Sequence, residues 1–185
     1  YNIITIADEV QCGFGRTGTY WNIEQKGVTP DILTFGKGIA SGFPLAGLVS
    51  TEKIMDNIGS NFLGGTYGGN GMSLAAASAT YDIFFRENIL NNVFLKSQLL
   101  HRELLNLPCI KSLRIYGLMI GIEFFFSDKP EKVQKIVKAM NKRHVLILTC
   151  GNNGQYIRLL PPLNVSNLEC EVFITNFKEV LEEVC

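Results

Sequence analysis

An apolar strand that ends in a glycine-flanked lysine is the feature that most constrains how this chain can fold. Ile32 to Phe35 predict a short buried strand, and Gly36-Lys37-Gly38 follow it directly. A lysine on a compact turn of small residues can lose part of its hydration, which lowers its pKa and frees the amine to form a Schiff base. A surface lysine in a turn fits the same residues, so Lys37 is a candidate nucleophile whose interpretation depends on the rest of the chain.

Acidic residues follow another predicted strand. Ile3 to Ala7 form a continuous apolar run rich in β-branched residues, which predicts a strand buried on both faces of a parallel sheet. Asp8 and Glu9 come directly after it, and ligands of open α/β sheets bind at the carboxyl ends of strands. Asp8 is therefore a candidate site residue, although a turn or helix-capping aspartate explains it equally well.

Two nucleotide-binding motifs are disfavoured by their context. Residues 13–18 match G-x-G-x-x-G, but a segment with two acidic residues, Asp8 and Glu9, separates this motif from its strand, and the carboxylates would repel a pyrophosphate. The pair Gly36-Lys37 does not belong to a phosphate-binding P-loop, because Asp31 stands at the first motif glycine and Gly38 stands where Ser or Thr is required.

Composition narrows the class of protein. The 185 residues include 17 basic and 17 acidic side chains, so there is no electrostatic argument for nucleic acid or an anionic membrane, and no apolar run reaches membrane-spanning length. We expect small molecules or proteins as partners. The two histidines argue against a histidine-built metal site. The five cysteines are scattered without a C-x-x-C pair, which predicts reduced thiols in an intracellular protein.

Two further residues are candidates for binding anionic groups. Thr66 lies in the glycine-dense stretch 64–71, whose backbone amides can turn inward toward an anion. Arg158 is a lone cation in the apolar run 156–163, and a guanidinium can hold a carboxylate by two parallel hydrogen bonds. The alternative for the stretch around Thr66 is a flexible surface loop. The alternative for Arg158 is an internal ion pair.

The remaining pattern predicts helices followed by an α+β region. Residues 72–85 and 88–105 have helical composition, and apolar positions 133, 136, 137 and 140 fall on one helical face. Residues 118–126, 145–148 and 156–163 read as strands, and Ser166 and Glu169 form a capping box before a closing helix. We place a domain boundary near Leu107-Pro108.

Three motifs, taken in order, closely resemble the class III pyridoxal-phosphate-dependent aminotransferases. They are residues 7–18 (ADEVQCGFGRTG), 30–37 (PDILTFGK) and 65–70 (GTYGGN). Residues 148–151 and 157–163 look most like the 4-aminobutyrate aminotransferase branch of that family. Cys12 and Gly71 depart from the family pattern, which usually has threonine and proline at these positions.

The resemblance implies an α/β structure with the fold of the pyridoxal-phosphate-dependent transferases (fold type I). Residues 1–107 would be the end of the large, mainly parallel-sheet domain together with its connecting helices. Residues 108–185 would form the small C-terminal α+β domain. The chain opens with Tyr1 and runs straight into a strand, so we expect it to be part of a longer protein, with cytoplasmic and mitochondrial locations both open.

The resemblance also assigns roles around the cofactor. Lys37 would hold the cofactor aldehyde as a Schiff base and later move a proton between the substrate carbon and the cofactor. Asp8 would keep the pyridine nitrogen protonated, so that the ring can accept electrons. Val10 would pack on the ring face, and Gln11 would bind the ring hydroxyl oxygen.

Two more roles concern the phosphate and the substrate. Thr66 would reach the cofactor phosphate of the neighbouring subunit, which implies a homodimer. Arg158 would bind the substrate carboxylate.

The leading hypothesis is a transaminase that moves an amino group from an ω-amino acid, with 4-aminobutyrate the first choice, to a 2-oxo acid such as 2-oxoglutarate. One alternative is a class III enzyme for another donor, namely ornithine, acetylornithine or a diamine. Another is a catalytically inactive paralogue or fragment. A third alternative, a nucleotide-binding oxidoreductase, is supported only by the G-x-G-x-x-G match at residues 13–18.

Overall fold

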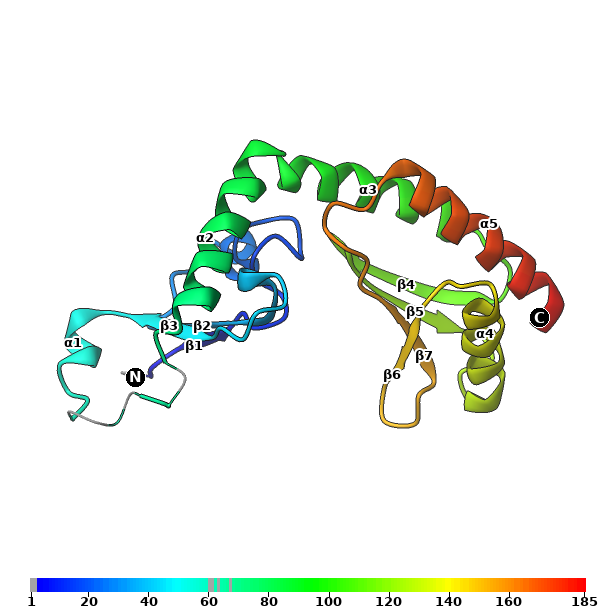
Figure 1. Cartoon of the computed structure of the whole chain (residues 1–185). Coiled ribbons are helices and arrows are strands. Elements are labelled where there is room, and N and C mark those ends of the chain that lie inside the picture. The colour runs from blue at the N-terminus through cyan, green and yellow to red at the C-terminus, as the bar shows by residue number, and fades with distance from the viewer. Residues whose placement is uncertain (1–2, 60–61, 63, 67) are drawn as a thin grey trace. The chain divides into compact units, whose positions relative to one another are not determined.

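A computed structural model describes residues 3–59, 62, 64–66 and 68–185 (Figure 1), and its secondary structure falls into two units. Unit 1 is Tyr1–Leu90 and unit 2 is Asn91–Cys185, so the division falls inside α3 (Ile89–Leu104). The boundary near Leu107-Pro108 stays a prediction about the domains of the whole protein. Among the helices of the described ranges, none is both long and apolar enough to cross a membrane.

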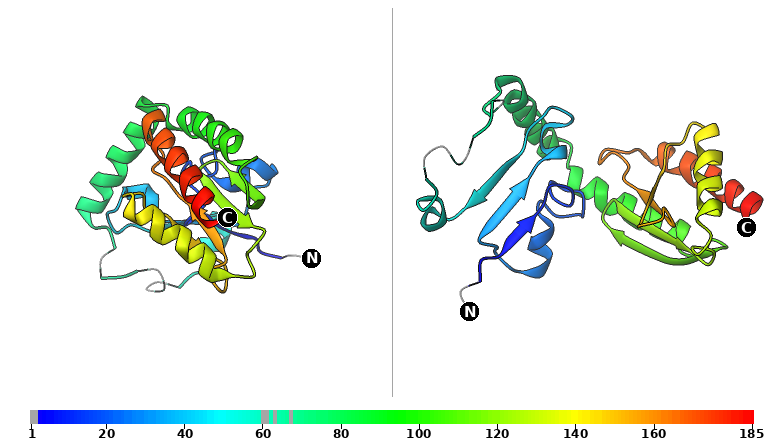
Figure 2. Two further views of the ribbon diagram at one scale, coloured as in Figure 1. Left: turned by 90° about the vertical axis from the view of Figure 1, so that its right-hand side faces the viewer. Right: turned by 90° about the horizontal axis from the view of Figure 1, so that it is seen from below.

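Unit 1 contains a sheet in the order β1-β2-β3, whose strands lie side by side in Figure 2. Its elements are β1 (Ile6–Asp8), η1 (Asn22–Lys26), β2 (Ile32–Phe35), η2 (Lys37–Ala40), β3 (Gly47–Ser50), α1 (Glu52–Met55) and α2 (Gly71–Arg86). β1 and β2 are parallel, with Asp8 opposite Thr34, whereas β2 and β3 are antiparallel. The parallel pairing brings the carboxyl ends of β1 and β2 to the same edge of the sheet.

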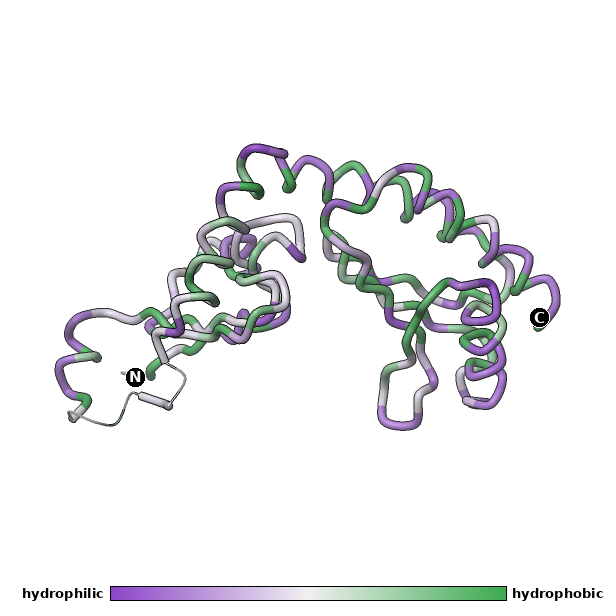
Figure 3. The backbone as a smooth tube through the Cα atoms, viewed as in Figure 1, coloured by the Kyte–Doolittle hydropathy of each residue, from purple (hydrophilic) through white to green (hydrophobic). Residues whose placement is uncertain are grey.

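The expectation that the first strand is buried on both faces is wrong for the described residues. Ile4 and Ile6 are 58% and 63% exposed, although Figure 3 shows this segment as hydrophobic. β1 is an edge strand that pairs only with β2 in the part of the chain that the structure describes. The continuous apolar run therefore indicated a strand. It did not indicate whether other described residues of unit 1 cover that strand.

Unit 2 is built on an antiparallel sheet in the order β4-β5-β7-β6. Besides α3, its elements are β4 (Ile110–Tyr116), β5 (Met119–Phe124), α4 (Pro130–Lys142), β6 (Leu148–Cys150), β7 (Tyr156–Leu159) and α5 (Asn167–Val184). β4 and β5 form a hairpin across Gly117, which has a φ of 55°. The sequence predicted strand 118–126 but not β4 as its partner.

The core of unit 2 lies where alternate residues of β5 and β7 meet the helices. Buried side chains come from β5, β7, α3, α4 and α5: Ile120, Ile122, Phe124, Ile157, Leu159, Val93, Leu104, Val133, Ile136, Met140, Phe177 and Leu181. The predicted apolar face of α4 is confirmed by the burial of Val133, Ile136 and Met140. The predicted capping box of α5 is also confirmed, with Ser166 accepting from the Glu169 amide.

Polar side chains of α3 hold the segment between β7 and α5. The Asn92 Nδ2 donates to the carbonyl oxygens of Leu163 and Val165, at 2.8 and 3.1 Å. The Lys96 Nζ, on a side chain that is largely buried, donates to Asn167 Oδ1 at 2.7 Å. Because buried polar groups are costly unless they are hydrogen-bonded, these contacts fix how the chain leaves β7.

The prediction of reduced thiols is wrong for two cysteines. A disulfide joins Cys109, before β4, to Cys185, after α5, with 6.3 Å between the Cα atoms. Cys12, Cys150 and Cys170 are free. The pair cannot be recognised in the sequence, where the two cysteines have a separation of 76, because only the packing of unit 2 brings them within disulfide reach.

Candidate active site

The Asp8 carboxylate lies at the carboxyl end of β1, facing the end of β2. Its Oδ1 accepts hydrogen bonds from the Val10 amide at 3.1 Å and from the Thr34 hydroxyl at 3.3 Å. The side chain is nevertheless exposed in unit 1. Asp8 is thus oriented by its own turn and by the neighbouring strand, while its carboxylate stays accessible to a ligand.

Lys37 is the first residue of η2, which follows β2 after Gly36. Its backbone is left-handed, with a φ of 45°, a conformation that is uncommon for residues other than glycine. The exposed side chain donates from Nζ to the Gln11 Oε1 at 2.8 Å. Local backbone strain of this kind often occurs at functional sites, where surrounding structure supports it.

Val10 and Gln11 occupy the turn between Asp8 and the glycine-rich segment 13–18. Val10 is half-buried, and a Cβ built on Gly36 would lie 3.6 Å from Val10 Cγ1. The turn after β1 therefore packs against the lysine loop after β2. The structure brings Asp8, Val10, Gln11 and Lys37 together at one edge of the sheet.

Glu9, which has no assigned role in the sequence, is buried in the structure and only 3% exposed. Its Oε1 accepts from the Ile23 amide at 2.7 Å, and its Oε2 accepts from the Cys12 thiol at 3.0 Å. Burial, followed by the hydrogen bond to Glu9, raises the pKa of Cys12 to about 11. An acid directly after Asp8 was the only sequence signal for this contact.

Thr66 is exposed in the loop that precedes α2, and its neighbour Tyr67 lies outside the described residues. That loop ends at Asn70, whose side chain caps α2 by accepting from the Met72 and Ser73 amides. Within the described ranges, no hydrogen bond joins Thr66 to Asp8, Gln11 or Lys37. Its expected role toward a neighbouring subunit stays a prediction.

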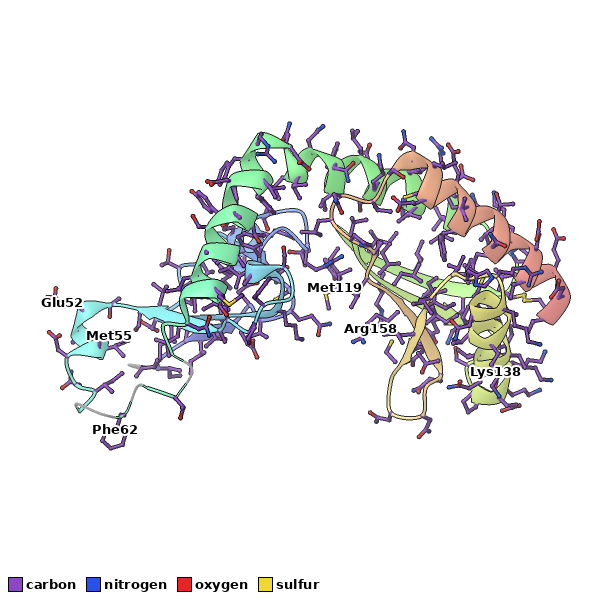
Figure 4. The ribbon with its side chains drawn as sticks, viewed as in Figure 1. Glu52, Met55, Phe62, Met119, Lys138 and Arg158 are labelled. Atoms are coloured by element: carbon purple, nitrogen blue, oxygen red, sulfur yellow. A yellow bond between two sulfur atoms is a disulfide. The ribbon has the colours of Figure 1, made fainter. Side chains whose placement is uncertain are left out.

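Arg158 lies on β7 in unit 2, opposite Gly121 of β5 and Leu148 of β6, and is labelled in Figure 4. Its Nε is buried and has no hydrogen-bond partner among the described residues. No carboxylate of those residues forms an ion pair with it, so the internal ion pair weighed in the sequence is not found. Arg158 also borders a cavity of about 460 Å³ in unit 2 that is lined mainly by apolar side chains.

The groups in unit 1 suit pyridoxal phosphate chemically. A carboxylate can hold a proton on the pyridine nitrogen, an amide can bind the ring oxygen, and a primary amine can bind the aldehyde. Asp8, Gln11 and Lys37 supply these groups, and the 2.8 Å bond between Lys37 and Gln11 places two of them in contact. The residues present therefore fit this cofactor.

The model of the class III aminotransferases matches residues 1–181. The chain belongs to the class III aminotransferases. This family depends on pyridoxal phosphate, in agreement with the fit of Asp8, Gln11 and Lys37.

Curated relatives support the same family. The chain is 39% identical to 4-aminobutyrate aminotransferase GabT of Escherichia coli, over 91% of this chain and 42% of the relative. It is 35% identical to 5-aminovalerate aminotransferase DavT of Pseudomonas putida, over 100% of this chain and 45% of the relative. It is 37% identical to acetylornithine aminotransferase of Haemophilus ducreyi, over 99% of this chain and 45% of the relative. The chain thus spans less than half the length of these bacterial relatives, which give no support to a mitochondrial location.

Solved structures share the fold. A transaminase from the marine bacterium Virgibacillus superposes with a TM-score of 0.91 at 28% identity, over 100% of this chain and 46% of that one. The ornithine aminotransferase of Toxoplasma gondii superposes with a TM-score of 0.85 at 27% identity, over 99% of this chain and 44% of that one. That structure is described with partial occupancy of pyridoxal phosphate at its active site. The predicted fold type is confirmed.

Proposed function

We propose that this chain carries the lysine, pyridine-binding acid and substrate arginine of a pyridoxal-phosphate-dependent aminotransferase. The amino donor is an ω-amino acid, with 4-aminobutyrate the first choice, and the acceptor is a 2-oxo acid such as 2-oxoglutarate. The observation that carries the proposal is the hydrogen bond between Lys37 and Gln11 beside Asp8, at the edge where β1 and β2 end.

Each group at this edge has a defined task. Bound pyridoxal phosphate supplies an electron sink for the substrate carbon that loses its proton. The Lys37 Nζ would hold the cofactor at its aldehyde carbon and would also carry that proton. The Asp8 carboxylate stabilises positive charge on the ring nitrogen. Gln11 orients both Lys37 and the ring oxygen, and Val10 provides an apolar surface for the ring.

Arg158 provides the proposed contact to the donor. A carboxylate is the natural partner for its unpaired Nε, because a guanidinium binds both carboxylate oxygens at once. 4-Aminobutyrate has its carboxylate at the end opposite the reacting amine. The 39% identity to GabT of Escherichia coli supports this donor.

Other donors have support from the comparisons. The chain is similar to relatives named for 5-aminovalerate and for acetylornithine, at 35% and 37% identity. Both of these donors also carry a carboxylate, so Arg158 serves all three equally well. The assembly we propose is a homodimer in which Thr66 of one subunit contacts the cofactor phosphate bound by the other.

The test is a spectroscopic titration of the whole protein loaded with pyridoxal phosphate. We expect the visible absorbance of the lysine-bound cofactor to disappear when 4-aminobutyrate is added and to return with 2-oxoglutarate. Lys37→Ala abolishes this band, because no other amine occupies its position. Lys53→Ala, which changes an exposed lysine in α1, is the matched control and keeps the band.

The other outcomes separate the alternatives. A band that ignores 4-aminobutyrate but responds to 5-aminovalerate, ornithine or acetylornithine keeps the aminotransferase and changes the donor. The absence of any band in the wild-type protein would favour a catalytically inactive paralogue and contradict the role of Lys37.

A further inference from the structure

Glu9 is a buried acid that does not contact Lys37, Gln11 or any other group of the proposed chemistry through its carboxylate. The side chain is 3% exposed, and both carboxylate oxygens accept hydrogen bonds. One comes from the Ile23 amide at 2.7 Å and the other from the Cys12 thiol at 3.0 Å. We call Glu9, Cys12 and Ile23 the Glu9 cluster.

The backbone of Glu9 is fastened as well. Its amide donates to the carbonyl oxygen of Thr34 in β2 at 2.9 Å, and its carbonyl accepts from the Gly13 amide at 3.0 Å. Glu9 therefore connects β1 to β2, closes its own turn, and ties that turn to η1. Charged acceptors form hydrogen bonds about twice as strong as neutral ones, so the carboxylate contacts are the firm part of this arrangement.

The turn has little freedom to move elsewhere. A Cβ built on Gly13 would lie 2.7 Å from both the Glu9 carbonyl and the Trp21 ring, so the backbone packs directly against these groups. The Cys12 thiol also lies 3.3 Å from the Asp8 carbonyl oxygen. Movement of the Glu9 cluster would consequently shift Asp8 on one side and Gln11 on the other.

We propose that Glu9 is a positioning residue whose buried carboxylate holds Asp8 and Gln11 in register for the pyridine nitrogen, the ring oxygen and Lys37. This inference rests on the proposed function of those three residues. It assigns Cys12 a task as well, because its thiol supplies one of the two donors that hold the carboxylate.

A carboxylate suits this place better than an amide. Both of its oxygens accept, whereas glutamine has one accepting oxygen and one donating nitrogen. In Glu9→Gln the nitrogen faces either the Ile23 amide, which is itself a donor, or the thiol, which is a weak acceptor. One hydrogen bond of the Glu9 cluster is therefore lost or weakened.

The first measurement reports on the cluster without any cofactor. We expect Glu9→Gln to lower the pKa of Cys12 from about 11 toward its ordinary value of 9.0, because the hydrogen bond and the charge of Glu9 both contribute to raising it. Alkylation of the Cys12 peptide as a function of pH, followed by mass spectrometry, measures this change. Glu24→Gln is the matched control: Glu24 is exposed and accepts from the Trp21 amide.

The second measurement reports on positioning. We expect Glu9→Gln to weaken pyridoxal phosphate binding roughly tenfold, as for loss of one hydrogen bond of about 1.4 kcal/mol, and to lower kcat with an unchanged KM for the donor. Cys12→Ser keeps a donor and should bind the cofactor like the wild type, whereas Cys12→Ala should share the defect. Thermal melting identifies any variant that fails to fold. If Glu9→Gln does not fold, the comparison of Cys12→Ser with Cys12→Ala tests the proposal instead.

Failure of this inference differs from failure of the proposed function. If the wild-type protein binds pyridoxal phosphate and Glu9→Gln binds it equally well, with the Cys12 pKa lowered, then Glu9 is not a positioning residue. A defect in Cys12→Ser as large as that in Cys12→Ala would also overturn the inference. If the wild-type protein does not bind the cofactor, the proposed function itself is wrong, and the inference with it.

Discussion

At the residue scale, the buried Nε of Arg158 has no hydrogen-bond partner in the part of the chain that the structure describes. An unsatisfied buried donor costs free energy, and a ligand that accepts from it recovers that cost. Arg158 therefore favours an anionic ligand even though unit 2 by itself supplies none.

We predict that Arg158→Ala selectively impairs carboxylated donors. A hydrogen bond to a charged group contributes about 1.5–3 kcal/mol, so kcat/KM for 4-aminobutyrate should fall roughly 10- to 100-fold. Steady-state kinetics with 4-aminobutyrate and with a simple alkylamine measure the difference. The control is Arg114→Ala, on β4. An equal loss for both donors in Arg158→Ala would contradict the assigned role.

The site residues were predictable from sequence to the extent that their chemistry is local. Asp8, Gln11 and Lys37 each follow a strand or sit in a turn, which the sequence shows, whereas the structure supplies the parallel pairing of β1 and β2 that brings them together. Glu9 was not predictable as a buried residue, because its donors include the Ile23 amide, 14 positions away. Only folding brings that amide to the carboxylate.

At the element scale, Asp31 fastens β2 to the chain that leads into β1. Its Oδ2 accepts from both the amide and the hydroxyl of Thr5, each at 2.7 Å. These two bonds stabilise the ionised carboxylate and lower the pKa of Asp31 below its ordinary value of 3.8. The side chain thus links the beginnings of the two strands that present Asp8 and Lys37.

We predict that this link makes unit 1 sensitive to acid. Because the pKa of Asp31 is lowered on folding, its contribution to stability is present above the ordinary value of 3.8 and is lost as the pH falls through the lowered pKa. Asp31→Asn should lower the melting temperature at neutral pH and flatten its acid dependence. Thermal unfolding followed over pH tests this, with Asp56→Asn in the same unit as the control. Parallel pH curves for Asp31→Asn and the wild type would contradict the prediction.

Element prediction was most accurate where the signal repeats along one segment. α2 and α3 begin and end within a few residues of the predicted bounds, and α4 and α5 contain the predicted apolar face and follow the predicted capping box, because helical periodicity and caps are local. Strand β4 was missed as an element, since a hairpin partner is defined by pairing with β5 and not by its own pattern. The exposure of β1 was also missed, because burial depends on what packs against a strand.

At the scale of the whole molecule, the Cys109–Cys185 disulfide closes most of unit 2 into a loop with a sequence separation of 76 residues. It connects the start of the sheet to the end of the last helix. A bond across so long a segment restricts the unfolded chain strongly, so it stabilises the folded state.

We predict that removing this bond destabilises unit 2 by about 2–4 kcal/mol. Cys185→Ser, or reduction with dithiothreitol, should shift the urea midpoint of unfolding to lower concentration. Cys150→Ser, which changes a free cysteine in the same unit, is the matched control and should leave the midpoint unchanged. Equal midpoints for Cys185→Ser and the wild type would show that the bond contributes nothing to stability.

The sequence by itself determined the family, the order of the helices and the reactive groups at the ends of β1 and β2, because each depends on neighbouring residues. The tertiary structure decided that Lys37 bonds Gln11, that Glu9 is buried, that the Arg158 Nε lacks a partner among the described residues, and that Cys109 meets Cys185. These features depend on burial and on contacts between distant segments. No local pattern encodes them, since the free energy of such contacts arises only when the chain has folded.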